Sequence, residues 1–126
     1  MLQSPLYPAD NAVRTHIDSW MDFAKSLGPI SRTTGYAVVG WAAFNADDFA
    51  DGIAAYKRAL DGLERHLAGR EWLVGSSITL ADVLAGMEQA LLYMCFFEKD
   101  MQAAYPATAR WFERVYNSDV VQKVVG

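Results

Sequence analysis

The chain has 126 residues, of which 52% are hydrophobic and 13% aromatic. This composition excludes a disordered chain and is typical of one domain that buries a sizeable core. Eleven basic and fifteen acidic residues give a net charge of −4. That balance argues against direct nucleic-acid binding, because proteins that bind phosphate backbones present a basic face.

Cys95 is the only cysteine in the chain, so no internal disulfide can form. Together with the absence of a signal peptide, this favours a reducing, cytoplasmic location. The longest apolar stretch is interrupted by Glu88 and Gln89 and is too short to predict a membrane span.

The first predicted element is a helix that follows an extended lead-in. Residues 1–9 contain two prolines, and Asp10 or Asn11 can cap a helix that opens a domain over residues 10–126. Its apolar face repeats at spacings of three and four residues: Val13, Ile17, Trp20, Phe23, Ala24 and Leu27. We expect Gly28-Pro29 to end this helix, since glycine and proline are common just past a helix end.

Residues 35–44 are apolar without a clear period. We interpret them as a second buried helix, with a strand as the alternative.

A third helix has the clearest periodicity. Asp47 or Asp48 is expected to start it, and Gly69 to end it. One stripe is apolar throughout: Phe49, Ile53, Tyr56, Leu60, Leu63 and Leu67. The opposite face is expected to be solvated: Asp51, Lys57, Arg58, Asp61, Glu64 and Arg65.

A central helix is predicted from Leu80 to Phe97. Thr79 is suited to the N-cap and Asp82 to the third helical position, the pair that forms a capping box. Ile78 and Val83 occupy the two positions of a hydrophobic staple. Because the helix is apolar almost all round, we expect it in the middle of a bundle.

Two further helices are predicted near the end of the chain, after a charged break at residues 98–100. Tyr105-Pro106 opens the first of them, because proline is tolerated at the first helical position. Its inward face is expected to be formed by Ala109, Phe112, Val115 and Tyr116. Asp119 begins a short last helix. The sequence therefore predicts an all-α helical bundle of about six helices.

Residues that could carry chemistry are few. His16 and His66 lie far apart in sequence on different predicted helices, and His66 is accounted for by the favourable position of a cation in a last helical turn. Cys95 lies in an apolar segment and is expected to be a buried, inert thiol. Glu88 is either an acid with a perturbed pKa or a carboxylate that is paired or faces a groove. No phosphate loop, nucleophile elbow or zinc motif is present, so we expect no catalytic residue, cofactor or metal.

Three segments carry a family resemblance: WLVG (72–75), ITLADV (78–83) and YPATARWFERV (105–115). They resemble the C-terminal helical domain of the glutathione transferase superfamily. Within it, the third segment is most similar to the transferase-like domain of elongation factor 1-gamma and to related domains linked to aminoacyl-tRNA synthetases. In the transferases a thioredoxin-like N-terminal domain supplies the glutathione site and the catalytic residue. No βαβ pattern precedes the helices here, so the resemblance implies the helical fold without that domain and without its activity.

The resemblance implies an interaction module of the translation machinery that holds elongation-factor subunits or synthetases. In the synthetase-linked relatives an arginine at the position of Arg110 contacts an aspartate of the partner, so Arg110 is our candidate interface residue. The alternative is that Arg110 pairs with an acid of its own chain, Asp82 or Glu113. Trp111 is expected in the core.

A second hypothesis is that the chain is the hydrophobic-substrate half of a thiol transferase. The substrate would then occupy an apolar groove lined by Trp20, Phe23, Tyr36 and Trp41. A two-fold homodimer is a further expectation, because an uncovered apolar patch tends to find a partner.

Overall fold

The computed structural model describes residues 6–38, 40, 45–96 and 99–125. Its helices are α1 (Asn11–Ile30), α2 (Tyr36–Val38), α3 (Ala46–Leu67), α4 (Leu80–Glu88), α5 (Ala90–Phe96), α6 (Lys99–Ala104), α7 (Pro106–Tyr116) and α8 (Asp119–Val125), with a π-helical turn, η1 (Ser31–Gly35). None of these described residues forms a strand, and the expected all-α class is confirmed. Among them, no helix is both long and apolar enough to cross a bilayer.

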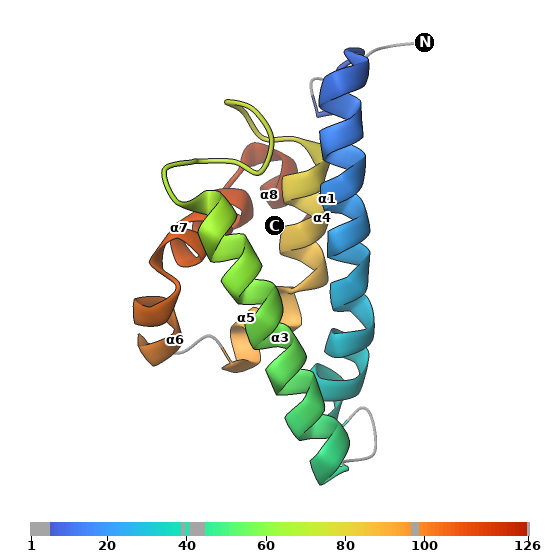
Figure 1. The fold of residues 1–126 in the computed structure, drawn as a ribbon, viewed down its shortest axis with the longest axis vertical. Coiled ribbons are helices and arrows are strands. Elements are labelled where there is room, and N and C mark those ends of the chain that lie inside the picture. Colours follow the sequence, from blue (N-terminus) through green and yellow to red (C-terminus); the bar gives the residue numbers. More distant parts are fainter. Residues whose placement is uncertain (1–5, 39, 41–44, 97–98, 126) are drawn as a thin grey trace.

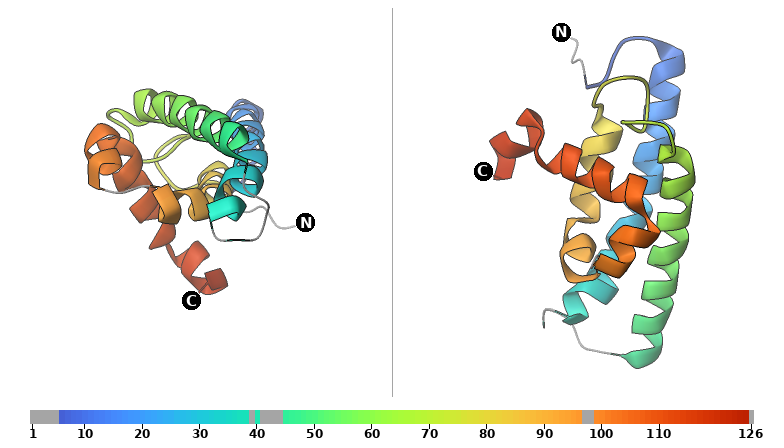
Figure 2. Two further views of the ribbon diagram at one scale, coloured as in Figure 1. Left: turned by 90° about the horizontal axis from the view of Figure 1, so that it is seen from below. Right: turned by 90° about the vertical axis from the view of Figure 1, so that its left-hand side faces the viewer.

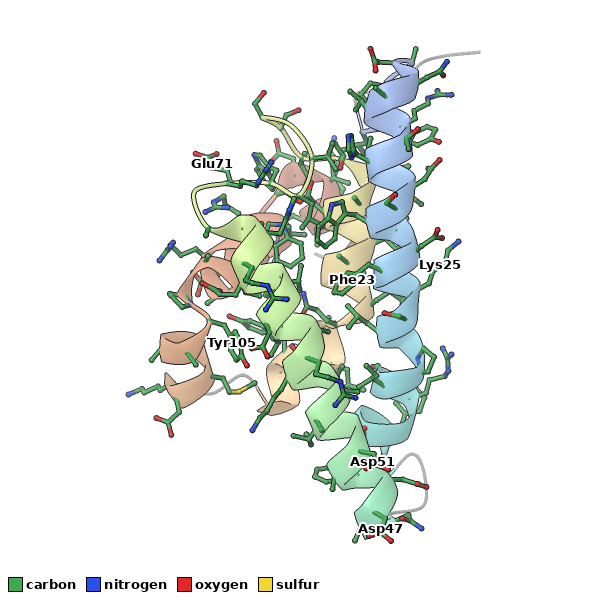
Figure 3. The ribbon with its side chains drawn as sticks, in the orientation of Figure 1. Phe23, Lys25, Asp47, Asp51, Glu71 and Tyr105 are labelled. Atoms are coloured by element: carbon green, nitrogen blue, oxygen red, sulfur yellow. The ribbon has the colours of Figure 1, made fainter. Side chains whose placement is uncertain are left out.

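The long helices α1 and α3 and the shorter α4 extend along the longest axis of the molecule (Figure 1). Helix α7 runs obliquely across them, and α8 projects away from α1 and α3 (Figure 2). The charged side chain of Lys25 points outward from α1, whereas Phe23 lies on the side of α1 that faces the other helices (Figure 3). Helix α4 packs against both α1 and α7, and so lies between them in the bundle.

The start of α1 agrees with the prediction, but its end does not. Asp10 caps the helix by accepting the backbone N–H of Val13 at 3.0 Å. The helix then continues through Gly28 and Pro29 to Ile30 and passes into η1. Gly28 is buried, and a Cβ there would stand 3.1 Å from Oε2 of Glu88. Glycine at this position serves the close packing of α1 on α4, so the expected stop was wrong.

The predicted element at 35–44 is only partly described. Gly35 belongs to η1, and Tyr36–Val38 form the short helix α2. Residues 39 and 41–44, including Trp41, lie outside the described residues. Where the chain is described, the helical interpretation holds and the strand alternative does not.

Helix α3 buries the later part of the expected stripe, leaves Phe49 and Ile53 partly buried, and ends as expected. Tyr56, Leu60, Leu63 and Leu67 are buried, and Gly69 follows with a φ of +77°. Its start lies slightly earlier than predicted. Asn45, rather than Asp47 or Asp48, is the N-cap and accepts the backbone N–H of Asp48 at 3.0 Å.

The predicted central helix is divided at Gln89 into α4 and α5. The backbone of Gln89 has a φ of −102° and a ψ of 4°, outside the helical range. Its side chain is fully buried, and its Oε1 accepts the hydroxyl of Tyr56 at 3.1 Å. The side chain thus has a partner on α3, which the apolar pattern of the helix itself did not indicate. Lys99 and Asp100, expected in a charged break, are exposed but helical, and they begin the short helix α6, which was not predicted.

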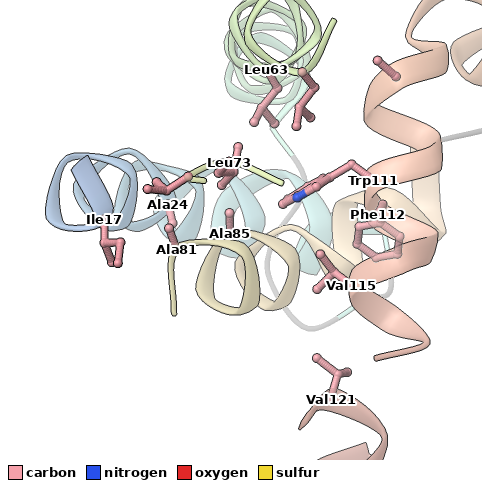
Figure 4. Close-up of a cluster of buried hydrophobic side chains, with 13 residues drawn as sticks. Ile17, Ala24, Leu63, Leu73, Ala81, Ala85, Trp111, Phe112, Val115 and Val121 are labelled. Carbon is pink, nitrogen blue, oxygen red and sulfur yellow. The ribbon is translucent and has the colours of Figure 1, made fainter. Parts of the chain in front are cut away.

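Asp82 joins three segments of the fold. Its carboxylate is fully buried and accepts the backbone N–H of Leu73 at 2.8 Å, that of Thr79 at 2.9 Å and the indole N–H of Trp111 at 2.8 Å. Thr79 and Asp82 thereby form a capping box at the start of α4. Trp111, also fully buried, extends from α7 into the core (Figure 4). One carboxylate therefore holds the loop at 72–79, the first turn of α4 and α7 together.

Glu64 performs a similar role at the start of α7. It accepts the backbone N–H groups of Ala107 and Thr108 at 3.0 and 2.9 Å, and the Thr108 hydroxyl at 3.0 Å. These are N–H groups that a helix leaves without an intrahelical partner. The expectation that Glu64 lies on a solvated face was wrong, because a second helix supplies its donors.

Candidate protein-docking surface

The described residues contain no cluster of side chains suited to metal binding. No three of their histidine, cysteine, aspartate or glutamate side chains are grouped to hold a metal ion. The side chain of Cys95 lies outside what the structure describes. The notable surface is apolar.

Three large apolar side chains are exposed on the face formed by α4, α5 and α7. Met87 is 41% exposed, Met94 77% and Tyr116 48%. We call these three residues, with the cavity between them, the docking face. Met87 and Met94 belong to the helix pair that was expected to be buried all round, and Tyr116 was expected to point inward. Covering this surface would remove apolar area from water, which is favourable.

The cavity of the docking face has a volume of about 230 Å³. Besides the three exposed residues, its lining consists of Gly86, Ala90, Phe112, Val115 and Val121. Gly86 allows α7 to approach α4, because a Cβ there would stand 2.9 Å from Cγ1 of Val115. Phe112 is held by stacking on Tyr93, with ring centroids 3.7 Å apart. The walls are therefore made by packed core residues.

A second cavity adjoins the docking face across Met87 and Met94. It measures about 410 Å³ and is more polar, with Gly28, Ser31, Arg32, Tyr36, Glu88, Ala90 and Leu91 in its lining. Glu88 is half-buried, and a Cβ on Gly28 would stand 3.1 Å from its carboxylate and 3.2 Å from the guanidinium of Arg32. Glu88 therefore faces a groove, one of the alternatives that the sequence left open.

Arg110 lies on the exposed side of α7, in a wide groove of about 710 Å³. The groove also contains Trp72 and Ile78 from the loop before α4, and Arg114 from α7. The Arg114 guanidinium lies 5.9 Å from the ring centroid of Trp72 and donates a hydrogen bond to the backbone carbonyl of Glu71. Among the residues that the structure describes, Arg110 forms no ion pair with Asp82 or Glu113.

The Arg110 groove is continuous with the docking face. Glu113 and Asn117 line this groove and also line a cavity that contains Met94 and Tyr116. The exposed side of α7 therefore carries Arg110 next to the apolar docking face.

The aromatic residues predicted to line one groove are separated. Trp20 packs against Phe23, with centroids 5.3 Å apart, and against His66 at 4.3 Å. Tyr36 instead lines the cavity beside Glu88, and Trp41 lies outside the described residues. The structure does not bring Trp20 and Tyr36 together.

Sequence reasoning missed Met87 and Met94 as surface residues. The signal was present, because a helix apolar on all sides can be covered completely only if enough neighbours surround it. In this chain α1 and α7 pack on α4, and the side that carries Met87 remains open.

The chain is similar to elongation factor 1-gamma 1 of Oryza sativa subsp. japonica, with 32% identity over 98% of the chain and 30% of that protein. Among solved structures, it is similar to the GST-like domain of elongation factor 1-gamma from Saccharomyces cerevisiae, with a TM-score of 0.80 and 26% identity over 94% of this chain and 55% of that one. A glutathione S-transferase from Xanthobacter autotrophicus gives a TM-score of 0.79 and 28% identity over 92% and 57% of the two chains. The chain therefore spans about a third of the curated relative and just over half of the solved ones.

The resemblance drawn from the motifs at 72–83 and 105–115 is confirmed by these similarities. A family model described as "Glutathione S-transferase, C-terminal domain" matches residues 30–119, and the chain belongs to that family.

Proposed function

We propose that this chain is a non-catalytic protein-docking module of the translation elongation machinery, acting in the cytoplasm. The observation that carries the proposal is the docking face, where the large apolar side chains of Met87, Met94 and Tyr116 are exposed around an apolar cavity. The similarity to elongation factor 1-gamma proteins supports the choice of process. The occupant is a subunit of an elongation-factor or aminoacyl-tRNA synthetase complex that presents an apolar surface with an acidic residue beside it.

Two features of the surface support a protein occupant. Methionine adapts its flexible side chain to a partner and is frequent at binding surfaces. Arg110 lies in the connected groove without an ion pair among the described residues, and arginine beside an apolar patch is typical of interface anchors. Arg110 would therefore pair with the acidic residue of the partner.

Direct binding measured with purified components tests this proposal. The tagged chain is titrated with purified elongation-factor subunits and, separately, with synthetases from the same cells. We expect Met94→Glu and Arg110→Glu each to weaken binding about tenfold or more, as for anchor residues of an interface. Arg58→Glu, the same charge reversal on the exposed side of α3, is the matched control and should bind as the wild type does.

Equal binding by Arg110→Glu, Met94→Glu and the control would refute the docking surface. If the chain binds none of these proteins but self-associates through Met94, the homodimer replaces the heteromeric partner.

The cavity beside Tyr36 and Glu88 favours a second candidate, the hydrophobic-substrate half of a thiol transferase. It shares Met87, Ala90 and Met94 with the docking face, and the similarity to a solved glutathione S-transferase supports it. We expect the chain alone to conjugate no glutathione to an aromatic electrophile such as a chloronitrobenzene. Measurable turnover that one substitution, for example Tyr36→Phe, abolishes would establish this candidate instead.

A further inference from the structure

The two histidines of the chain line the same cavity, although they are far apart in sequence. This cavity has a volume of about 240 Å³ and lies between α1, α3 and the loop that follows α3. Helix α1 contributes His16 and Trp20, α3 contributes His66, and the loop contributes Arg70, Leu73, Val74 and Gly75. It shares no lining residue with the docking face.

His66 is held in a defined orientation. Its Nε2 lies 2.7 Å from the carbonyl oxygen of Leu73. A carbonyl oxygen only accepts, so Nε2 carries the proton and donates it. The ring also lies against Trp20, with centroids 4.3 Å apart. Nδ1 is therefore the nitrogen that gains a proton when His66 becomes charged.

The charges around the cavity favour an anion. Arg70 carries a permanent positive charge, His16 and His66 can each gain one, and no aspartate or glutamate is among the lining residues. Arg70 forms no ion pair within the described part of the chain. This local excess of positive charge is found in a chain whose net charge is −4.

A metal ion is a poorer occupant than an anion. Two imidazoles without a carboxylate or thiolate offer too few ligands for an ordinary zinc site, and the guanidinium of Arg70 would repel a cation. Arginine instead matches the planar geometry of carboxylates and the oxygens of phosphates or sulfates. Trp20 adds an apolar wall beside these donors.

We propose that this cavity binds a small molecule that carries an oxyanion group, either a carboxylate or a phosphate-like group. Arg70 contacts the oxyanion through its guanidinium, and protonated His66 donates from Nδ1. The rest of the ligand packs on Trp20.

Titration followed by NMR of the histidine rings tests the proposal. The full chain is titrated with sulfate and, separately, with benzoate, at a constant ionic strength of about 0.15 M. Both anions keep a constant charge between about pH 6 and pH 8, so the buffer pH does not change the ligand. His16→Gln assigns the two ring signals. Sulfate tests whether an oxyanion suffices, and benzoate tests whether an aromatic carrier is needed.

We expect saturable shifts of the His66 signal with at least one anion. Arg70→Gln should weaken this binding about fivefold or more, because it removes the guanidinium that contacts the oxyanion. Arg58→Gln removes the same charge from the exposed side of α3, outside the cavity, and should leave binding unchanged. Shifts that never saturate, or equal binding by the two arginine variants, would overturn the proposal.

Discussion

At the scale of single residues, two buried polar side chains form hydrogen bonds between elements that the apolar pattern of the sequence does not indicate. Asp82 was expected to cap the helix that follows it, and it also accepts hydrogen bonds from Leu73 and Trp111, which the sequence did not indicate. Gln89 interrupts an apolar helix and bonds Tyr56. Both side chains link elements that are distant in sequence. Their structural roles therefore depend on hydrogen-bond donors from those distant elements.

Replacing Asp82 with asparagine should lower the free energy of unfolding by about 2–4 kcal/mol, because a buried amide cannot accept from all three N–H donors. The change is nearly isosteric and leaves the apolar core in place. Urea denaturation monitored by circular dichroism measures the loss. Asp22→Ala removes an exposed carboxylate that makes a surface contact of 4.0 Å with Lys25, and should change stability by less than about 0.5 kcal/mol. Similar values for both variants would contradict the role of Asp82.

Tyr56 should make the protein sensitive to alkali. Burial, with a smaller contribution from the nearby Tyr93 hydroxyl, raises the pKa of Tyr56 above its ordinary value of 10.0. The unfolded chain therefore loses this proton first, and the stability that depends on the neutral phenol is present below about pH 10 and is lost as the pH rises above it.

Urea unfolding between about pH 8 and pH 11 checks this linkage, since free tyrosine titrates near pH 10. We expect Tyr56→Phe to reduce the steepness of the loss above pH 10. The variant should also be less stable at neutral pH by about 1 kcal/mol, because Gln89 loses its partner. An unchanged alkaline slope would show that other groups govern the response.

At the scale of elements, close contacts between helices depend on glycines that the sequence signals did not explain. Gly28 and Gly86 lie where α1 and α7 approach α4. Gly52 on α3 lies against the buried hydroxyl of Thr34 in η1. In each case the neighbour belongs to another segment, so no local rule for helix ends or turns applies.

Gly52 and Gly62 on α3 form a matched pair for testing this point. A Cβ on Gly52 would overlap Thr34, whereas nothing lies within 4 Å of a Cβ on Gly62. Gly62→Ala should stabilise the protein by up to about 1 kcal/mol, since alanine favours the helix. Gly52→Ala should destabilise it by about 1–3 kcal/mol despite the same propensity gain, because the core is overpacked. Thermal unfolding of both variants measures the difference, and a gain in both would refute the contact.

At the scale of the whole molecule, we expect the docking face to govern how the chain associates in solution. The α4–α5 pair contributes to the core on one side and exposes Met87 and Met94 on the other. An exposed apolar patch of this kind marks an interaction site and also a tendency to associate.

Met94→Glu should therefore improve solubility without a cost in stability, because the side chain is 77% exposed. We expect the free energy of unfolding to change by less than about 0.5 kcal/mol, as for other surface substitutions. Binding of an apolar fluorescent dye should fall, as should self-association measured by analytical ultracentrifugation. Leu92→Glu, on the buried side of α5, is the contrasting variant and should unfold the protein. Unaltered dye binding by Met94→Glu would place the apolar surface elsewhere.

Much of the fold follows from the sequence alone. The cap at Asp10, the stripe from Tyr56 to Leu67, the end at Gly69 and the start of α7 at Pro106 depend on residues within one or two helical turns of each other. Such local preferences act before any tertiary contact forms, so they can be read from neighbouring residues. The motifs at 72–83 and 105–115 likewise sufficed to indicate the family.

Only the tertiary structure decided the continuation of α1 through Pro29, the break at Gln89, the anchoring of α7 by Glu64 and the exposure of Met94. It also decided that Trp20 and Tyr36 line different cavities and that His16 and His66 line the same one. Each of these depends on a side chain from a segment far along the chain. The free energy of a buried hydrogen bond or a close helix contact is set by that distant partner, and the local sequence does not contain it.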